Sequence, residues 1–151
     1  MAQIGFYHLL TLPLEQALPR LLEKALAAGL RVVVMAGSAE RVSYLDERLW
    51  TYADESWLPH GTERDGDAPL QPVWLTCRDE NPNGATVLVV CDGAESARMG
   101  AYARCLDLFD GKDADAVQAA RERWKRWKAE GHELVYYQQT GSGGWEEKAR
   151  A

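Results

Sequence analysis

Residues 120–131, ARERWKRWKAEG, concentrate side chains that could bind a charged and aromatic partner. Besides two tryptophans, the stretch holds the cations Arg121, Arg123, Lys125, Arg126 and Lys128. The chain as a whole is acidic, with a formal net charge of −6. Tryptophan and arginine are enriched at interface hot spots. Suitable ligands are anionic and partly apolar, such as a nucleic-acid strand stacked on a ring or an acidic peptide ending in an aromatic residue.

A helix over residues 116–128 would place its two tryptophans on different sides. Trp127 shares a side with alanines, so we predict that it packs on the core. A second stripe, at helical spacing, consists of Val117, Arg121, Trp124 and Lys128, with Lys125 at its edge. Two interpretations of this stripe stay open. Either Trp124 is a core residue among cations that form a solvated face, or the stripe is a recognition patch.

A second aromatic cluster occurs in LDERLWTYADESWLPHG, at the start of a long connection over residues 51–72. It contains Trp50, Tyr52, Trp57, Leu58, Pro59 and His60. One interpretation is a loop that folds its own aromatic side chains onto the core. The other is an apolar protein interface, because tryptophans and a proline can form a rigid hydrophobic surface.

Signatures of other chemistry are missing from the sequence. It contains no GxGxxG, GxxxxGK[ST] or GxSxG motif, so neither a phosphate cradle nor an activated serine is predicted. The turn AGSAE, residues 36–40, lies where such folds bind phosphates, but we interpret Ser38 as the N-cap of a helix. Adjacent carboxylates do not share a helix face and are interpreted as solvated surface.

Histidines and cysteines are too scattered to indicate a metal or redox site. His8, His60 and His132 show no HxxxH or HExxH spacing, so no metal is expected. The cysteines are Cys77, Cys91 and Cys105. Because they are odd in number and far apart, we predict reduced cysteines in the core and no disulfide framework.

Hydrophobic periodicity predicts the elements that position these residues. The expected helices cover about 13–28, 39–50 and 113–131, and the expected strands cover 3–9, 31–36, 73–76, 85–92, 105–110 and 132–139. The Asn-Pro-Asn-Gly turn indicates that strands 73–76 and 85–92 form a hairpin. Alternating strands and helices predict one three-layer α/β domain over 1–140 with a mainly parallel central sheet. Residues 141–151 are expected to form a flexible tail from which Trp145 could dock.

Charge and hydropathy indicate where in the cell the protein is found and which classes of partner it can bind. The apolar runs at 32–36 and 85–90 are far shorter than the roughly 20 residues that cross a bilayer, and no secretory signal is recognisable at residues 1–10. We therefore expect a cytoplasmic protein. A sequence pI near 5.1 disfavours nucleic-acid binding by the whole surface, since phosphate neutralisation needs a positive footprint.

These motifs together resemble the chi subunit of bacterial DNA polymerase III holoenzyme. The resemblance is carried, in chain order, by FYHL, LDERLW, DESWLPHG and ARERWKRWKAEG followed by a last strand. It implies a Rossmann-like, non-catalytic subunit that needs no cofactor. Chi subunits link the clamp loader complex, through the psi subunit, to single-stranded-DNA-binding protein. The acidic C-terminal tail of that protein ends in a phenylalanine carboxylate.

The resemblance also implies two binding surfaces. The tail-binding positions are Val117, Arg121, Trp124 and Lys125, with Lys128 as a further cation. Here tryptophan replaces a common tyrosine at 124, and valine replaces a common lysine at 117. The surface for psi or a helicase partner is implied at Trp50, Trp57, Pro59 and His60. Two alternatives stay open: direct single-stranded nucleic-acid binding by the basic helix, and a small α/β enzyme with its site in residues 51–72.

Overall fold

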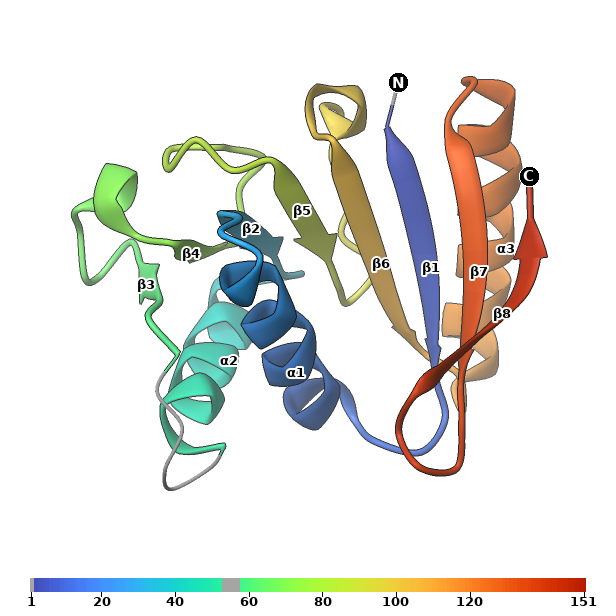
Figure 1. The fold of residues 1–151 in the computed structure, drawn as a ribbon, viewed down its shortest axis with the longest axis horizontal. Helices are drawn as coiled ribbons and strands as arrows, with labels where there is room; N and C mark the ends of the chain where they lie inside the picture. The colour runs from blue at the N-terminus through green and yellow to red at the C-terminus, as the bar shows by residue number, and fades with distance from the viewer. Residues whose placement is uncertain (1, 53–57) are drawn as a thin grey trace.

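A mainly parallel sheet forms the centre of the computed structural model, which describes residues 2–52 and 58–151 (Figure 1). The described strands are ordered β3-β4-β2-β5-β6-β1-β7-β8, and every pairing is parallel except β7 with β8. The strands are β1 (Gln3–Leu9), β2 (Val32–Met35), β3 (Gly61–Thr62), β4 (Val73–Thr76), β5 (Val87–Val90), β6 (Arg104–Asp110), β7 (Glu133–Gln139) and β8 (Trp145–Arg150). The helices are α1 (Leu14–Ala27), α2 (Ala39–Thr51) and α3 (Ala114–Ala129), with 3-10 turns η1 (Ala68–Leu70) and η2 (Met99–Ala101).

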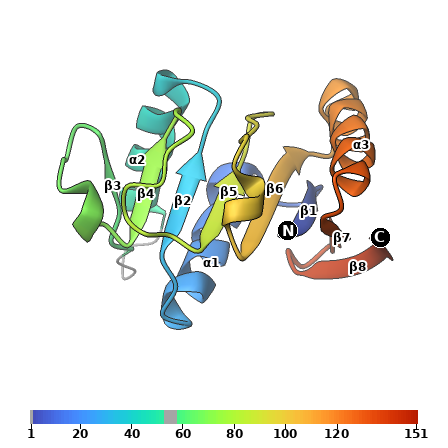
Figure 2. The same cartoon turned by 90° about the horizontal axis from the view of Figure 1, so that it is seen from above.

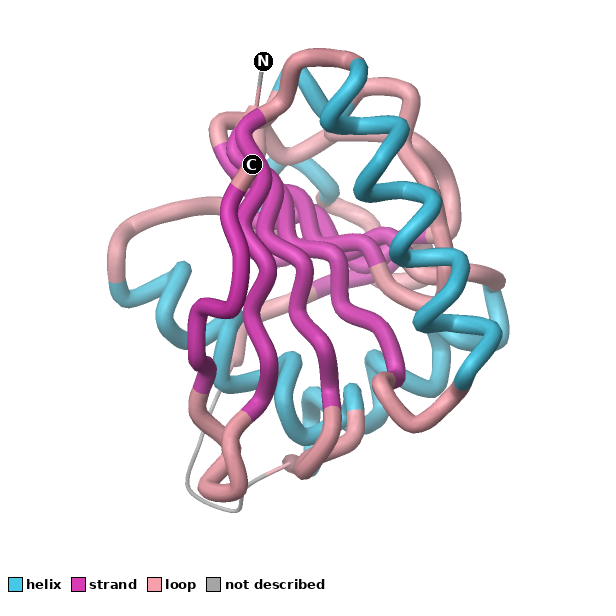
Figure 3. Tube along the Cα trace, turned by 90° about the vertical axis from the view of Figure 1, so that its right-hand side faces the viewer, coloured by secondary structure: helices cyan, strands magenta, loops and turns pink. Residues whose placement is uncertain are grey.

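The two faces of the sheet bury separate apolar clusters. Strand side chains alternate between the faces, so Tyr7 and Leu9 of β1 join the cluster under α1 and α2. Ile4 and Phe6 join the other cluster, against which α3 packs through Trp127. In Figure 3, α3 lies along one side of the strands, where it contacts β6 and β7. The predicted three-layer α/β architecture is therefore confirmed.

The helix and strand positions agree closely with the sequence periodicity. Ser38 begins α2 as predicted, and its hydroxyl oxygen accepts a hydrogen bond from the backbone N–H of Arg41 at 3.2 Å. All four residues of β2 are buried, as expected for a strand covered on both faces.

The predicted hairpin of residues 73–76 and 85–92 is wrong. Strands β4 and β5 run parallel to β2 on its two sides, so β2 separates them. The Asn-Pro-Asn-Gly segment belongs instead to the crossing connection. The buried amide of Asn83 donates to the carbonyl oxygens of Val32 and Gln71 at 3.1 and 2.9 Å. Asn83 thus fixes the connection to neighbouring backbone, while Asn81 closes a local turn by hydrogen bonds to the backbone of Ala85.

The expectation of a flexible tail at residues 141–151 needs correction, because β8 lies there. The chain turns at Gly143, which has a φ of 87°, and β8 then pairs antiparallel with β7. Trp145 docks as its sequence allowed, with its ring 4.9 Å from the ring of Tyr7 at an angle of 89°. Its apolar ring gives this charged segment an anchor on the sheet.

Two of the three cysteines lie where the sequence predicts. Cys91 and Cys105 are buried and reduced, but Cys77 is exposed. It directly follows β4, at the start of the connection toward β5, so the prediction of a core position is wrong for this residue.

Candidate functional site

Helix α3 is held on the sheet by one aromatic and one ionic contact. Trp127 is 3% exposed, and its ring lies 5.5 Å from the ring of Phe6, which confirms the predicted core role. Arg123 makes a two-point contact with Asp107 of β6, with Nε 2.7 Å from Oδ2 and Nη2 3.1 Å from Oδ1. Burial raises the pKa of Asp107, whereas the charge and hydrogen bonds of Arg123 lower it. The sequence did not reveal this pair, because periodicity alone does not identify a buried arginine.

Next to the contacts of Trp127 and Arg123, α3 and the sheet form a pocket of about 620 Å³ that is open to solvent. We call it the basic aromatic pocket, and its defining residues are Phe6, Val117, Arg121, Trp124, Lys125 and Tyr136. The four residues from α3 come together because Val117, Arg121 and Trp124 share one helical stripe and Lys125 lies at its edge. Phe6 and Tyr136 come from β1 and β7, and no sequence spacing linked them to the stripe.

Trp124 forms the aromatic wall of the basic aromatic pocket. It is half-buried, with its ring 5.3 Å from the ring of Phe6 and 6.4 Å from that of Tyr136, both in edge-to-face geometry. Such pairs are favourable for aromatic rings. Trp124 therefore combines features of both interpretations: one part of its surface packs on the core, and another part lines the pocket.

Positive charge at this pocket is free to meet a ligand. Arg121 and Lys125 are exposed, and neither forms an ion pair with any residue that the structure describes. Arg126, on the same helix, is instead paired with Glu95. Lys128 is exposed but does not line the pocket.

Tyr136 and His8 form a hydrogen bond next to the basic aromatic pocket. Burial raises the pKa of Tyr136, an effect that the charge of Arg121 opposes. Burial also lowers the pKa of His8, and Arg121 acts in the same direction. Arg121 is thus close enough to influence both groups. The β-prone segments gave no signal for this pair, whose members are 128 positions apart.

The second predicted surface lies around α2 and the segment after it. Trp50 is 51% exposed, and its ring lies 4.5 Å from the ring of buried His60. Nδ1 of His60 lies 2.7 Å from the Leu58 carbonyl oxygen, and Nε2 lies 2.9 Å from Oδ1 of Asp46. Pro59 is half-buried, and Trp57 lies outside the described residues. The exposed indole of Trp50 therefore packs against the buried ring of His60 and is available for contact with a partner.

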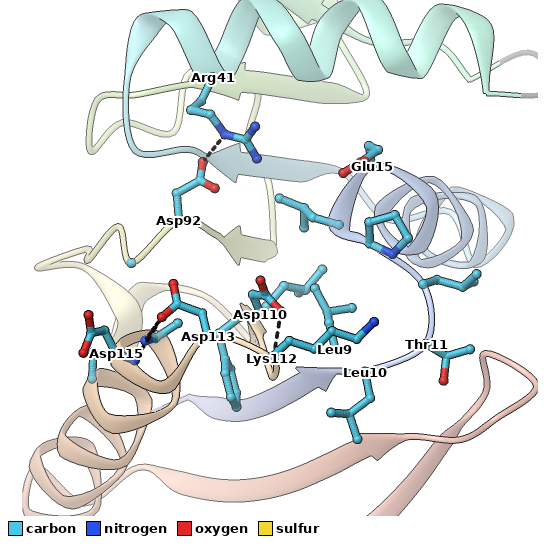
Figure 4. A pocket seen from close by; sticks show the side chains of 18 of the residues that line it. Leu9, Leu10, Thr11, Glu15, Arg41, Asp92, Asp110, Lys112, Asp113 and Asp115 are labelled. Atoms are coloured by element: carbon cyan, nitrogen blue, oxygen red, sulfur yellow. Dashed lines mark hydrogen bonds and ion pairs between the residues drawn. The ribbon is translucent and has the colours of Figure 1, made fainter.

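A further pocket of about 660 Å³ lies at the carboxyl ends of β1 and β6 (Figure 4). Folds of this type bind nucleotides at such a place. Here carboxylates of the chain itself accept hydrogen bonds from backbone N–H groups near the starts of two helices. Asp92 accepts from Gly37 N–H of the turn before α2, and Asp113 accepts from two N–H groups of α3. A phosphate would have to displace these carboxylates, so the geometry does not favour a nucleotide site.

Residues 2–52 and 58–151 contain neither a metal-binding cluster nor a membrane-spanning helix. No group of three or more His, Cys, Asp or Glu side chains there could hold a metal ion. No helix in these segments is both long and apolar enough to cross a membrane.

Comparison with known proteins gives a consistent result. The family model described as "DNA polymerase III chi subunit, HolC" matches residues 1–135. A probable DNA polymerase III subunit chi from Rickettsia prowazekii is 30% identical over 99 residues, which are 66% of this chain and 60% of the relative. The chain thus spans less than two thirds of the length of that relative. The chi subunits of Escherichia coli and Pseudomonas aeruginosa are 27% and 28% identical over 80% and 76% of this chain, and over 82% and 79% of their own lengths.

Proposed function

The chain belongs to the family of DNA polymerase III chi subunits, and from this premise we propose that it links two partners during replication. One partner is single-stranded-DNA-binding protein, whose acidic C-terminal tail would enter the basic aromatic pocket. The other is a clamp-loader subunit of the psi type, which would bind around Trp50. In this role the protein is a non-catalytic accessory subunit in the cytoplasm.

One observation carries the tail-binding proposal: the pocket combines an aromatic wall with cations that form no ion pair with any described residue, on a chain of net charge −6. A terminal phenylalanine ring would pack against Trp124 and Val117. Its carboxylate would meet Arg121, because guanidinium binds carboxylate through strong, charge-assisted hydrogen bonds. Lys125 would contact the acidic residues that precede the ring. The pocket thus offers a partner for each chemical feature of such a tail.

The position of the second surface supports a linking role. The surface around Trp50 belongs to α2 and the segment next to β3, whereas the basic aromatic pocket lies on α3. Figure 2 shows these elements at opposite ends of the sheet. Two partners could therefore bind at the same time without competing for surface. The exposed indole of Trp50 is the type of side chain that anchors protein interfaces.

Titration of a fluorescent acidic peptide ending in Asp-Phe tests the tail site. We expect Arg121→Ala to weaken binding at least tenfold, because a hydrogen bond to a charged group contributes about 1.5–3 kcal/mol. Arg126→Ala is the matched control: it removes one cation from the same helix, but Arg126 is paired with Glu95 outside the pocket. Equal affinity of wild type and Arg121→Ala would contradict the proposal.

Direct binding of single-stranded nucleic acid by α3 is the alternative. It predicts that an oligonucleotide competes with the peptide and that its affinity falls steeply with salt. The local nature of the basic surface favours the peptide, since Glu122 and Glu130 interrupt the cations of the same segment. Binding of an oligonucleotide with no binding of the peptide would reverse this preference.

A further inference from the structure

His8 lies between the basic aromatic pocket and the end of β6. From β7, the hydroxyl of Tyr136 is hydrogen-bonded to its Nδ1. From α3, the charge of Arg121 lowers the pKa of His8; from the end of β6, Asp110 raises it. The ring of Phe109 packs 5.1 Å away. His8 is thus linked to the pocket by its hydrogen bond to Tyr136 and by its electrostatic interaction with Arg121.

The two ring nitrogens of His8 face different groups. Nε2 faces Gly111, where an added Cβ would lie only 2.2 Å from it. The hydrogen bond to the Gly111 backbone raises the pKa of His8, as expected when the ring donates to a carbonyl. Neutral imidazole has one donor and one acceptor nitrogen. We take the neutral ring to carry its proton on Nε2; Nδ1 then accepts the hydrogen bond from the Tyr136 hydroxyl, whose proton points away from the pocket.

We propose that His8 and Tyr136 form a proton-coupled part of the ligand site. When His8 takes up a proton, Nδ1 becomes a donor to the oxygen of Tyr136. The hydroxyl proton of Tyr136 is then free to turn toward the pocket, where it can donate to a ligand carboxylate held by Arg121. Ligand binding and proton uptake by His8 therefore favour each other. This inference rests on the proposed function, since it requires an anionic ligand in the pocket.

The direction of the pH effect follows from linkage. In the free protein, burial keeps the pKa of His8 below its ordinary value. A bound carboxylate stabilises the imidazolium through Tyr136 and raises this pKa. Affinity for the ligand must then increase as the pH falls through the range between the two pKa values. Aspartate and terminal carboxylates have pKa values near 3.9 and 3.5, so the ligand stays ionised at pH 5.5.

The test compares peptide affinity at pH 7.5 and 5.5 at constant ionic strength, with the full chain and an acidic peptide ending in Asp-Phe. We expect wild type to bind several-fold more tightly at pH 5.5 than at pH 7.5, because ligand binding raises the pKa of His8. Tyr136→Phe should lose this gain, so the quantity compared is the ratio of each variant's own affinities at pH 5.5 and pH 7.5. Because Tyr136→Phe retains His8, His60 and His132, any pH effect that remains in this variant measures the contribution of the histidines without the Tyr136 hydroxyl.

NMR titration of the His8 imidazole provides a second measurement. Its pKa should rise when the free-acid peptide saturates wild type, and should not rise with the same peptide ending in an amide. An equal pH gain in wild type and Tyr136→Phe would overturn the inference and leave the proposed function intact. Absence of peptide binding at both pH values would overturn both.

Discussion

Arg123 of α3 and Asp107 of β6 form a two-point ion pair whose side chains are only 6% and 2% exposed. The contact fixes the rotation of α3 on the sheet. Because Arg123 faces inward, its neighbours Arg121 and Trp124 face the basic aromatic pocket. A buried pair thus determines which stripe of the helix is offered to a ligand.

Replacing only one member of this pair should strongly destabilise the fold. Arg123→Met leaves the Asp107 carboxylate buried without its cation, and we expect the free energy of unfolding to fall by about 3–5 kcal/mol. Urea denaturation followed by circular dichroism measures the change. The double variant Arg123→Met, Asp107→Leu should recover part of the loss, because no unpaired charge remains. Additive losses would show that the two side chains do not act as a pair.

The two tryptophans of α3 should separate stability from binding. Trp127→Ala removes a buried ring and should cost about 3–5 kcal/mol of unfolding free energy. Trp124→Ala removes a half-buried ring and should lower the free energy of unfolding by less. It should, however, weaken binding of the peptide ending in Asp-Phe more than a second variant of the core residue, Trp127→Leu, does. Denaturation curves and peptide titrations on the same samples provide both quantities. The reverse order of stability losses would contradict the assigned roles.

Sequence patterns predicted what lies within one element better than what joins several. Strand β1 and the Ser38 cap were found because spacing and capping are local properties. The separation of β4 from β5 by β2 was missed, since strand order depends on long-range pairing. The candidate site shows the same limit. Its α3 residues lie on one face of the helix, whereas Phe6 and Tyr136 reach the pocket from separate strands. The burial of Arg123 could not be predicted either, because it depends on the pairing of this residue with buried Asp107.

Lys125 and Lys128 should contribute unequally to tail binding. Lys125 lines the basic aromatic pocket and Lys128 does not, so Lys125→Ala should weaken the peptide more than Lys128→Ala. Both effects should shrink as salt is raised, because exposed charges are screened. Peptide titrations at two salt concentrations measure the difference. If Lys128→Ala had the larger effect, the ligand would lie nearer the C-terminal end of α3 than we propose.

The cysteines should differ in reactivity toward a thiol reagent. Burial raises the pKa of Cys105 to about 12 and also raises that of Cys91, so neither forms appreciable thiolate at pH 8. Cys77 is exposed. We expect Ellman's reagent to label one thiol rapidly in the native protein and the other two only after unfolding. Rapid labelling that persists in Cys77→Ser would show that a buried thiol is accessible.

Gly111 should be required for the position of His8. A Cβ added at 111 would lie 2.0 Å from Cδ2 of His8 and 2.6 Å from the Leu9 carbonyl oxygen, far inside van der Waals contact. The backbone contact cannot be relieved by a side-chain rotation, so Gly111→Ala should displace β1 or the loop and cost roughly 1–3 kcal/mol of stability. Gly141→Ala is the matched control, since no atom lies within 4 Å of its Cβ position. Thermal unfolding compares the two variants, and NMR of the His8 ring reports whether its hydrogen bond to Tyr136 is lost. If Gly111→Ala were as stable as Gly141→Ala with an unchanged His8 signal, the close packing of His8 on Gly111 would be wrong.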